Sequence, residues 1–229
     1  MSRVFSSCIE AQKEMERTLY EMGIKVRPYS YQNKIVKDND DFETIELQGA
    51  SYTVVDHNDM DQLENLTLDW CKAEFEERVS PIPINPGEAW RLRSDVWTQF
   101  LTKGFFDYTY NVRMREQLPI IIEELKERPN TRQAVIEIHN NQFDIYSLGG
   151  QRRIPCSLNY TFLIRKGRLD IYYMQRSCDF VTHYANDVWQ AIRLMKYVAD
   201  KVEVDYGHFH HYIVSLHAFH KDLKGKGIF

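Results

Sequence analysis

Apolar residues recur at helical spacing in several stretches of this chain. Between Val4 and Met22 they lie three or four positions apart among Glu, Lys and Gln, which predicts an amphipathic helix. Gly23 follows directly, as is common for the residue after a helix. The same spacing predicts further helices at 63–75, capped by Asp59 or Asp61, and at 93–101, 112–125 and 185–202.

Other stretches alternate apolar and polar residues, which is the pattern of strands with one buried face. The predicted strands are 44–52, 134–138, 143–146, 159–165, 168–175 and 211–218. Lys166-Gly167 joins two of them as a hairpin turn. Helices and strands do not follow a strict βαβ rhythm, and neither GxGxxG nor GxxxxGK[ST] occurs. The predicted fold class is therefore α+β, with one domain over residues 1–229 and helices packed against a sheet.

Composition narrows the class of protein. The 229 residues, 43% of them hydrophobic, suffice for one buried core. Acidic and basic residues are interspersed and sum to a net charge of −4, so we expect no direct binding of nucleic acid. No apolar run approaches the roughly 20 residues of a membrane helix. The four cysteines lack short paired spacing and no signal peptide is recognisable, so a cytoplasmic setting is expected, with no membrane partner. The Lys- and Gly-rich tail after Ala218 is expected to be mobile.

Cys156 is the candidate nucleophile. It follows a proline and two arginines, and Arg176-Ser177 is expected across the hairpin. A thiol near a guanidinium more readily becomes the thiolate that reacts. The alternative is a small buried hydrophobe, the usual role of a cysteine and the one expected for Cys178, which alternates with Ser177 and should face the other way. Planar guanidinium groups suit phosphate, and the candidates are Arg132, Arg152, Arg153 and Arg176.

Acidic and histidine side chains give further candidates. Asp179 and Asp187 lie in an otherwise apolar cluster and could contact a ligand, while Asn186 or Asp187 could equally cap the helix that starts there. His217 could donate to a sugar hydroxyl. His208 and His210 could share a metal ion on one face of a strand, but no carboxylate or cysteine stands nearby in the sequence. No metal is therefore expected.

Four separated elements of the chain resemble the thymidylate synthase family. They are Pro155-Cys156, Gln175-Arg176-Ser177-Cys178-Asp179, Asn186-Asp187 and Ser215-Leu216-His217. The resemblance implies a mixed sheet with helices against it, one sheet face being used for a homodimer. It also implies a pyrimidine deoxynucleotide monophosphate as substrate and 5,10-methylenetetrahydrofolate as co-substrate.

Carried over to this sequence, the resemblance implies a role for each matching residue. Cys156 would add to C6 of the pyrimidine, and Arg176 and Ser177 would hold the 5′-phosphate. Arg132 would reach the phosphate bound by the other subunit. Asp179 and Trp97 would lie near the folate, and Asn186, Asp187 and His217 would contact the nucleotide.

Two features point to the phage deoxycytidylate hydroxymethylase branch of that family. The stretch 44–52 is similar to an early strand of that branch, and Asp187 stands where thymidylate synthases have an asparagine that reads uracil. An aspartate suits the amino group of cytosine. The resemblance therefore implies a dCMP hydroxymethylase that adds a one-carbon unit and water at C5.

Other positions depart from the family pattern. Thr67 stands where the general acid/base glutamate is expected, three residues before Trp70, and Glu64 could substitute one helical turn earlier. Gln133 replaces the second phosphate-binding arginine. The alternatives left open are a thymidylate synthase-type methylase on dUMP or dCMP and a nucleotide-binding homologue without turnover.

Overall fold

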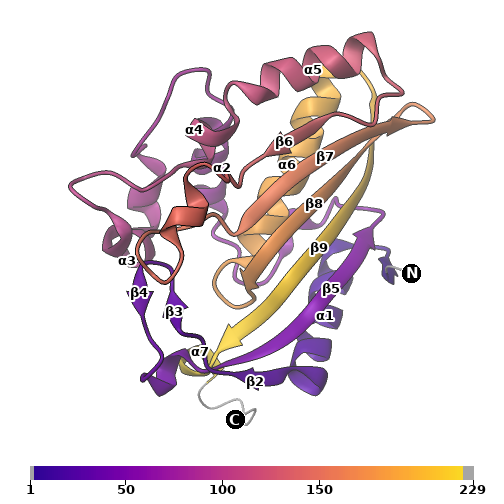
Figure 1. Ribbon diagram of the computed structural model, residues 1–229. Helices are drawn as coiled ribbons and strands as arrows, with labels where there is room; N and C mark the ends of the chain where they lie inside the picture. Colours follow the sequence, from indigo (N-terminus) through magenta and orange to yellow (C-terminus); the bar gives the residue numbers. More distant parts are fainter. Residues whose placement is uncertain (1–2, 224–229) are drawn as a thin grey trace.

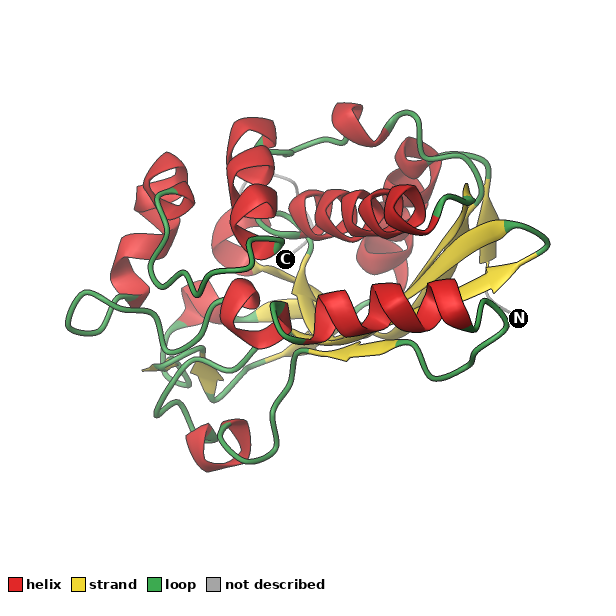
Figure 2. Ribbon diagram, turned by 90° about the horizontal axis from the view of Figure 1, so that it is seen from above, coloured by secondary structure: helices red, strands yellow, loops and turns green. Residues whose placement is uncertain are grey.

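The computed structural model describes residues 3–223, and the fold is α+β, as predicted. Figure 1 shows one large twisted sheet, and Figure 2 shows the helices that pack against it. Helix α6 (Tyr184–Val202) contacts β8 (Arg168–Asp179) and β9 (Asp205–Phe219), while α1 (Cys8–Met22) contacts β5 (Thr44–Val54). The core therefore lies between these helices and the sheet.

Among the described residues the large sheet has seven strands, in the order β1-β5-β9-β8-β7-β6 with β2 beside β5. The bounds of the strands not yet given are β1 Arg3–Phe5, β2 Ile24–Val26, β6 Val135–Glu137 and β7 Ser157–Arg165, and a separate small hairpin has β3 Ser30–Tyr31 and β4 Lys34–Ile35. The sheet is mixed, because β1 is parallel to β5 and β8 is parallel to β9.

The remaining helical segments are short. They are α2 Leu68–Arg78, α3 Ser94–Trp97, α4 Tyr110–Met114, α5 Gln117–Glu127 and α7 His220–Leu223, with 3₁₀ turns η1 Asp40–Phe42, η2 Met60–Gln62, η3 Ala89–Arg93, η4 Thr98–Phe100 and η5 Asp144–Ser147. Within residues 3–223, none of the helices has the length and apolar character needed to cross a membrane. Helix α7 occupies the start of the tail that was predicted to be mobile. The rest of that tail, residues 224–229, lies outside the described part of the chain.

The β7–β8 hairpin and α6 form as the residue pattern predicts. Lys166 and Gly167 both have positive φ (52° and 75°), which matches the two-residue turn whose twist suits a hairpin. Along α6 the apolar positions recur at helical spacing, and Val188, Ile192 and Met195 are buried on one face. These two elements carry five of the predicted site residues, namely Arg176, Ser177, Asp179, Asn186 and Asp187.

Three predicted boundaries are wrong for identifiable reasons. Asp59 does not cap the helix that follows it; its carboxylate instead accepts from the backbone N–H groups of Cys8 and Ile9 at the start of α1. The helix predicted at 63–75 begins only at Leu68. The stretch 93–101 is not one helix but a short α-helix between 3₁₀ turns.

Two further predicted elements, the helix at 112–125 and the strand at 143–146, differ in the structure, and in each case one side chain explains the difference. The helix predicted at 112–125 is divided into α4 and α5, because the ring of Pro119 would clash with the carbonyl of Arg115 four residues earlier in a continuous helix. The strand predicted at 143–146 is a helical turn. There Asp144 is buried, accepts from Asn140 N–H (2.7 Å) and pairs with Arg113 (2.7 Å).

The register of the parallel pair β8–β9 positions the site. Ser177 lies opposite Ser215, and Asp179 lies opposite His217. Residues from segments about 40 positions apart in the sequence therefore meet at the carboxyl ends of the two central strands, where the chain turns into α6.

Candidate active site

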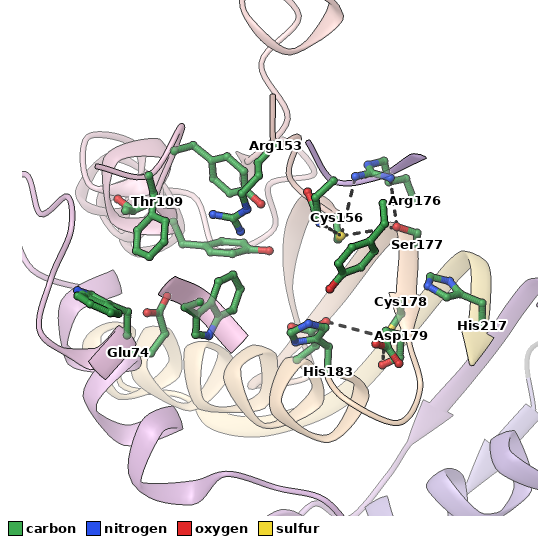
Figure 3. A pocket seen from close by; sticks show the side chains of 18 of the residues that line it. Glu74, Thr109, Arg153, Cys156, Arg176, Ser177, Cys178, Asp179, His183 and His217 are labelled. Atoms are coloured by element: carbon green, nitrogen blue, oxygen red, sulfur yellow. Dashed lines mark hydrogen bonds between the residues drawn. The ribbon is translucent and has the colours of Figure 1, made fainter. Parts of the chain in front are cut away.

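A cavity of about 280 Å³ opens at the carboxyl ends of β8 and β9, between these strands, α2 and the segment before β7 (Figure 3). Most of the predicted site residues line it: Trp97, Cys156, Arg176, Ser177, Asp179, Asp187 and His217. Its volume is near the lower end of the roughly 300–1,000 Å³ that is common for small-molecule sites.

Cys156 lies near the centre of this cavity with its sulfur half-buried (Figure 3). Its Sγ is 3.6 Å from Ser177 Oγ, 3.7 Å from Gln32 Nε2 and 3.9 Å from Arg176 Nη2. Three donor groups, one of them cationic, thus surround a partly accessible sulfur. This environment suits a nucleophile more than a packing residue.

Arg176 is held in place by the segment that leads to Cys156. Its Nε donates to the carbonyl of Pro155 (2.9 Å) and its Nη2 to that of Ile154 (2.9 Å), while Nη1 is 3.2 Å from Ser177 Oγ. Within the described residues no carboxylate pairs with this guanidinium. A fixed cation without a carboxylate partner beside a serine hydroxyl can bind an anion such as a phosphate.

Asp187 is oriented by a chain of buried hydrogen bonds. Gln175 Nε2 donates to Asp187 Oδ2 (2.8 Å), and Gln175 Oε1 lies 2.7 Å from His211 Nε2. Burial lowers the pKa of His211 to about 3, so its ring is neutral at pH 7. Since Oε1 can only accept, the proton lies on Nε2, and Nδ1 accepts from the hydroxyl of Tyr52 at 2.8 Å. Tyr184 donates in turn to Tyr52 (2.7 Å).

These hydrogen bonds determine which atoms of Gln175 and Asp187 face the cavity. The amide of Gln175 must turn its NH₂ toward Asp187, because its oxygen is already bound by His211. Among the described residues no hydrogen bond joins Asp187 Oδ1 to protein. Burial raises the pKa of Asp187 above its ordinary value, so this carboxyl takes up a proton more readily than a solvated one.

His217 and Asp179 lie side by side at the end of the strands. Burial lowers the pKa of His217, so the ring is neutral at pH 7 and can exchange hydrogen bonds with a hydroxyl group. Asp179 Oδ1 accepts from the N–H groups of Val181 (3.1 Å) and Thr182 (3.2 Å). Asp179 thereby stabilises the turn into α6 as well as lining the cavity.

One end of the cavity has an aromatic wall. Trp97 stacks on Trp70 (centroids 6.1 Å apart, planes at 19°) and meets Phe106 edge-on. Arg153, 6% exposed, places its guanidinium 4.9 Å from the ring centres of both Trp97 and Tyr108. Its Nε has no hydrogen-bond partner. This wall offers flat apolar surface and one buried cation to a planar ligand.

Three predicted residues lie outside the cavity. The side chain of Glu64 is exposed, and its backbone bonds to Gln12, so the expectation that Glu64 serves as the acid is corrected. Asn186 is buried, where Oδ1 accepts from Thr67 N–H (2.9 Å) and Nδ2 donates to Thr182 O (3.2 Å), so it joins α2 to α6 and does not face a ligand. Arg132 is exposed and does not line the cavity of its own chain.

Two further residues line the cavity, of which Glu74 has no counterpart among the predicted site residues. Glu74, on α2, faces the cavity opposite Cys156 (Figure 3). Its side chain is 19% exposed and pairs with Arg78 at 3.0 Å, and burial raises its pKa. Of the two neighbouring arginine candidates, Arg153 is buried and lines the cavity, while Arg152 is exposed. The sequence carried one signal for Glu74, namely its position two helical turns after Thr67.

Comparison with known proteins places this geometry in a family. The sequence model of the thymidylate synthase family matches residues 85–226 of this chain. A provisionally named thymidylate synthase from Methanocaldococcus jannaschii is 33% identical over 128 residues, which cover 52% of this chain and 58% of that protein. The deoxyuridylate hydroxymethyltransferase of Bacillus phage SP01 is 32% identical over 146 residues, 56% of this chain and 38% of that protein.

A thymidylate synthase from Haloferax volcanii is 27% identical over 154 residues, covering 66% of this chain and 40% of that protein. The chain spans about half the length of the curated relatives it matches. The matched family region contains the thiol, the guanidinium, the oriented carboxylate and the strand-end histidine that meet in the cavity. The chain therefore belongs to the thymidylate synthase family.

Proposed function

We propose that the protein is a hydroxymethyltransferase that acts at C5 of dCMP. The observation that carries this proposal is the Asp187 carboxyl, which Gln175 orients within the cavity that holds Cys156 and Arg176. A carboxyl group can accept from the exocyclic amino group of cytosine, which uracil lacks. The overall reaction combines dCMP, methylenetetrahydrofolate and water into 5-hydroxymethyl-dCMP and tetrahydrofolate.

Cys156 supplies the nucleophile in this proposal. Its sulfur adds to C6 of the pyrimidine, and the electron pair of the C5–C6 double bond makes C5 nucleophilic. Arg176 and Ser177 bind the 5′-phosphate and fix the base above the sulfur, since both lie within 4 Å of Sγ. The thiolate leaves again when the product forms, so the enzyme is regenerated.

Asp187 has a second role that follows from its raised pKa. A protonated carboxyl can donate to N3 of cytosine while its other oxygen accepts from the 4-amino group. A proton at N3 withdraws electrons from the ring and so assists addition at C6. The buried chain through Gln175 and His211 holds the carboxyl in the plane that this pairing requires.

The aromatic end of the cavity fits the co-substrate. The rings of Trp90, Trp97 and Phe106 line it, and a pterin ring can stack on such a surface. When bound, methylenetetrahydrofolate supplies the one-carbon unit that is transferred to C5. Glu74 lies at this end with a raised pKa, and we assign it the proton transfers that the family's glutamate performs, including activation of the water that completes the hydroxymethyl group.

The names of two relatives favour neighbouring activities. One relative is called a deoxyuridylate hydroxymethyltransferase and another a thymidylate synthase. The second candidate function is accordingly transfer to dUMP, with either a hydroxymethyl or a methyl product. The two substrates differ at the position that Asp187 faces, so substrate choice tests the assignment of that residue.

The test compares dCMP and dUMP, each tritiated at C5, in the presence of methylenetetrahydrofolate. We expect tritium release from dCMP and a product heavier than unlabelled dCMP by CH₂O, because a hydroxymethyl group replaces the hydrogen at C5, as measured by mass spectrometry. Cys156→Ala should abolish release. Asp187→Asn should lower kcat/KM for dCMP by about 100-fold, because a buried donor or acceptor then lacks its partner. Release from dUMP alone, or a methyl product, would contradict the proposal.

We also propose that the enzyme works as a homodimer through the outer face of the sheet. Met174 and Tyr212 are neighbours across β8 and β9, and together with Val214 they expose apolar surface on this face. A row of exposed apolar side chains in the centre of a sheet is typical of an interface. Arg132, which is exposed and does not line its own cavity, would then reach the phosphate in the other subunit.

A further inference from the structure

A second cluster of ligand-type side chains lies far from the cavity, near the amino ends of the same two strands. Asp170 belongs to β8, and His208 and His210 belong to β9. One ligand atom from each lies within 4.8 Å of the others. Asp170 lies six positions before Arg176, which is roughly 20 Å along an extended strand. The cluster therefore takes no part in the site described above.

The carboxylate of Asp170 is rigidly placed. Its Oδ1 accepts from the backbone N–H of His208 at 2.7 Å. A Cβ at position 207 would lie 2.1 Å from this oxygen, so glycine at 207 is what lets the carboxylate lie against β9. Oδ2 is turned toward the His210 ring, 3.9 Å from Nε2. The carboxylate thus supplies the ligand that the sequence alone did not place beside the two histidines.

The ring of His210 is held on two sides. It stacks on Tyr172 (centroids 4.2 Å apart, planes at 5°), and its Nδ1 is 2.8 Å from Thr53 Oγ1 on β5. Its Nε2 is buried and has no hydrogen-bond partner. In the tautomer whose Nδ1 donates to Thr53 Oγ1, Nε2 keeps its lone pair and is free to bind an ion, with the threonine as the outer-shell partner.

The alternative is a simple ion pair between His210 and Asp170. The 3.9 Å separation of Nε2 and Oδ2 is too long for a hydrogen bond. Two ligands bound to one tetrahedral zinc ion at about 2.0–2.2 Å lie about 3.4 Å apart, so a small side-chain rotation suffices for both to reach the same ion. The distance is thus closer to that of two ligands sharing an ion than to that of a hydrogen-bonded pair.

We propose that Asp170, His208 and His210 form a site for Zn²⁺, with water as the fourth ligand. Imidazole and carboxylate groups together suit zinc. The ion would join β8 to β9 directly and, through Thr53, to β5. Because an ion that binds only the folded chain stabilises it, the expected role is to stabilise the centre of the sheet and not to take part in the reaction.

The test titrates ZnCl₂ into chelator-treated protein by calorimetry. We expect one zinc per chain and a higher Tm when zinc is present. Loss of an outer-shell partner alone typically weakens binding by about 10- to 100-fold, so His208→Ala and His210→Ala should each weaken it by about 100-fold or more. His139→Ala, which removes a histidine outside the cluster, should bind as the wild type does.

The Asp170→Asn variant distinguishes loss of zinc binding from loss of the fold. It keeps an oxygen for the His208 N–H but removes the negative charge, so the fold should persist, as checked by circular dichroism, while zinc affinity falls. Cobalt(II) gives a second readout, since a tetrahedral site produces intense visible absorption. Wild-type protein that binds no zinc, or cluster variants that bind it as well as His139→Ala does, would overturn the proposal.

Discussion

Glu74 lies seven residues, about two helical turns, after Thr67, so the two positions fall on the same side of α2. The family pattern places the acid at the start of this helix, whereas this chain presents a carboxyl group to the cavity further along it. The side chain remains mostly buried beside Arg78. A missing motif residue therefore does not imply a missing group, because residues seven positions apart lie on the same side of a helix.

We expect Glu74→Gln to lower kcat by about 10²–10⁴-fold, the usual contribution of general acid/base catalysis. Burial raises the pKa of Glu74 above 4.5. The carboxylate form therefore appears only as pH rises through this higher pKa, and the acid limb of the wild-type kcat–pH profile should lie above pH 4.5. Rates measured across pH check both points. Glu64→Gln is the matched control and should behave like wild type; equal losses in both variants would contradict the assignment.

The elements that the sequence predicts best are those whose own pattern determines them. The β7–β8 hairpin and α6 need only local periodicity and the Lys166-Gly167 turn. The stretch 143–146 could not be predicted in the same way, because its turn depends on Asp144 pairing with the distant Arg113. The site follows the same rule: the sequence predicts the residues on β8 and α6, whereas only packing reveals that Glu74 faces the cavity and that Arg153, not Arg152, is buried there.

The end of α6 offers a prediction at this scale. Glu203 follows the helix with φ 58° and ψ 48°, a left-handed conformation that glycine adopts without the steric cost of a side chain. Glu203→Gly should therefore stabilise the protein by roughly 0.5–1 kcal/mol, as measured by urea unfolding. Glu123→Gly, in the interior of α5, should destabilise it by a similar amount. A loss of stability in Glu203→Gly would contradict this explanation of the helix end.

At the scale of the whole molecule, the proposed dimer explains two separate observations. The outer sheet face exposes Met174, Tyr212 and Val214, and Arg132 is exposed and does not line the cavity of its own chain. In a symmetric dimer each cavity would be lined by Cys156, Arg176 and their neighbours from one chain, and Arg132 would come from the other chain.

Mixing two inactive variants tests this arrangement. Cys156→Ala and Arg132→Ala each damage both sites of a homodimer, but a mixed dimer contains one intact site. After joint refolding, activity should recover to roughly a quarter of the wild-type value, because half of the dimers are mixed and each has one working site. Cys156→Ala mixed with Arg176→Ala should not recover, since both residues belong to the same chain's cavity. Recovery in neither mixture would exclude shared sites.

The position of β9 in the sheet has a consequence for how the protein is made. Within residues 3–223 it is the last strand in sequence order, yet it lies between β5 and β8. During synthesis the first half of the sheet and the β7–β8 hairpin can form early, but each keeps an unpaired edge until Phe219 has left the ribosome. Such edges readily pair with other chains. At about 5–20 residues per second, the nascent chain is exposed to misassembly until its final strand arrives, and the reaction cavity is completed only then.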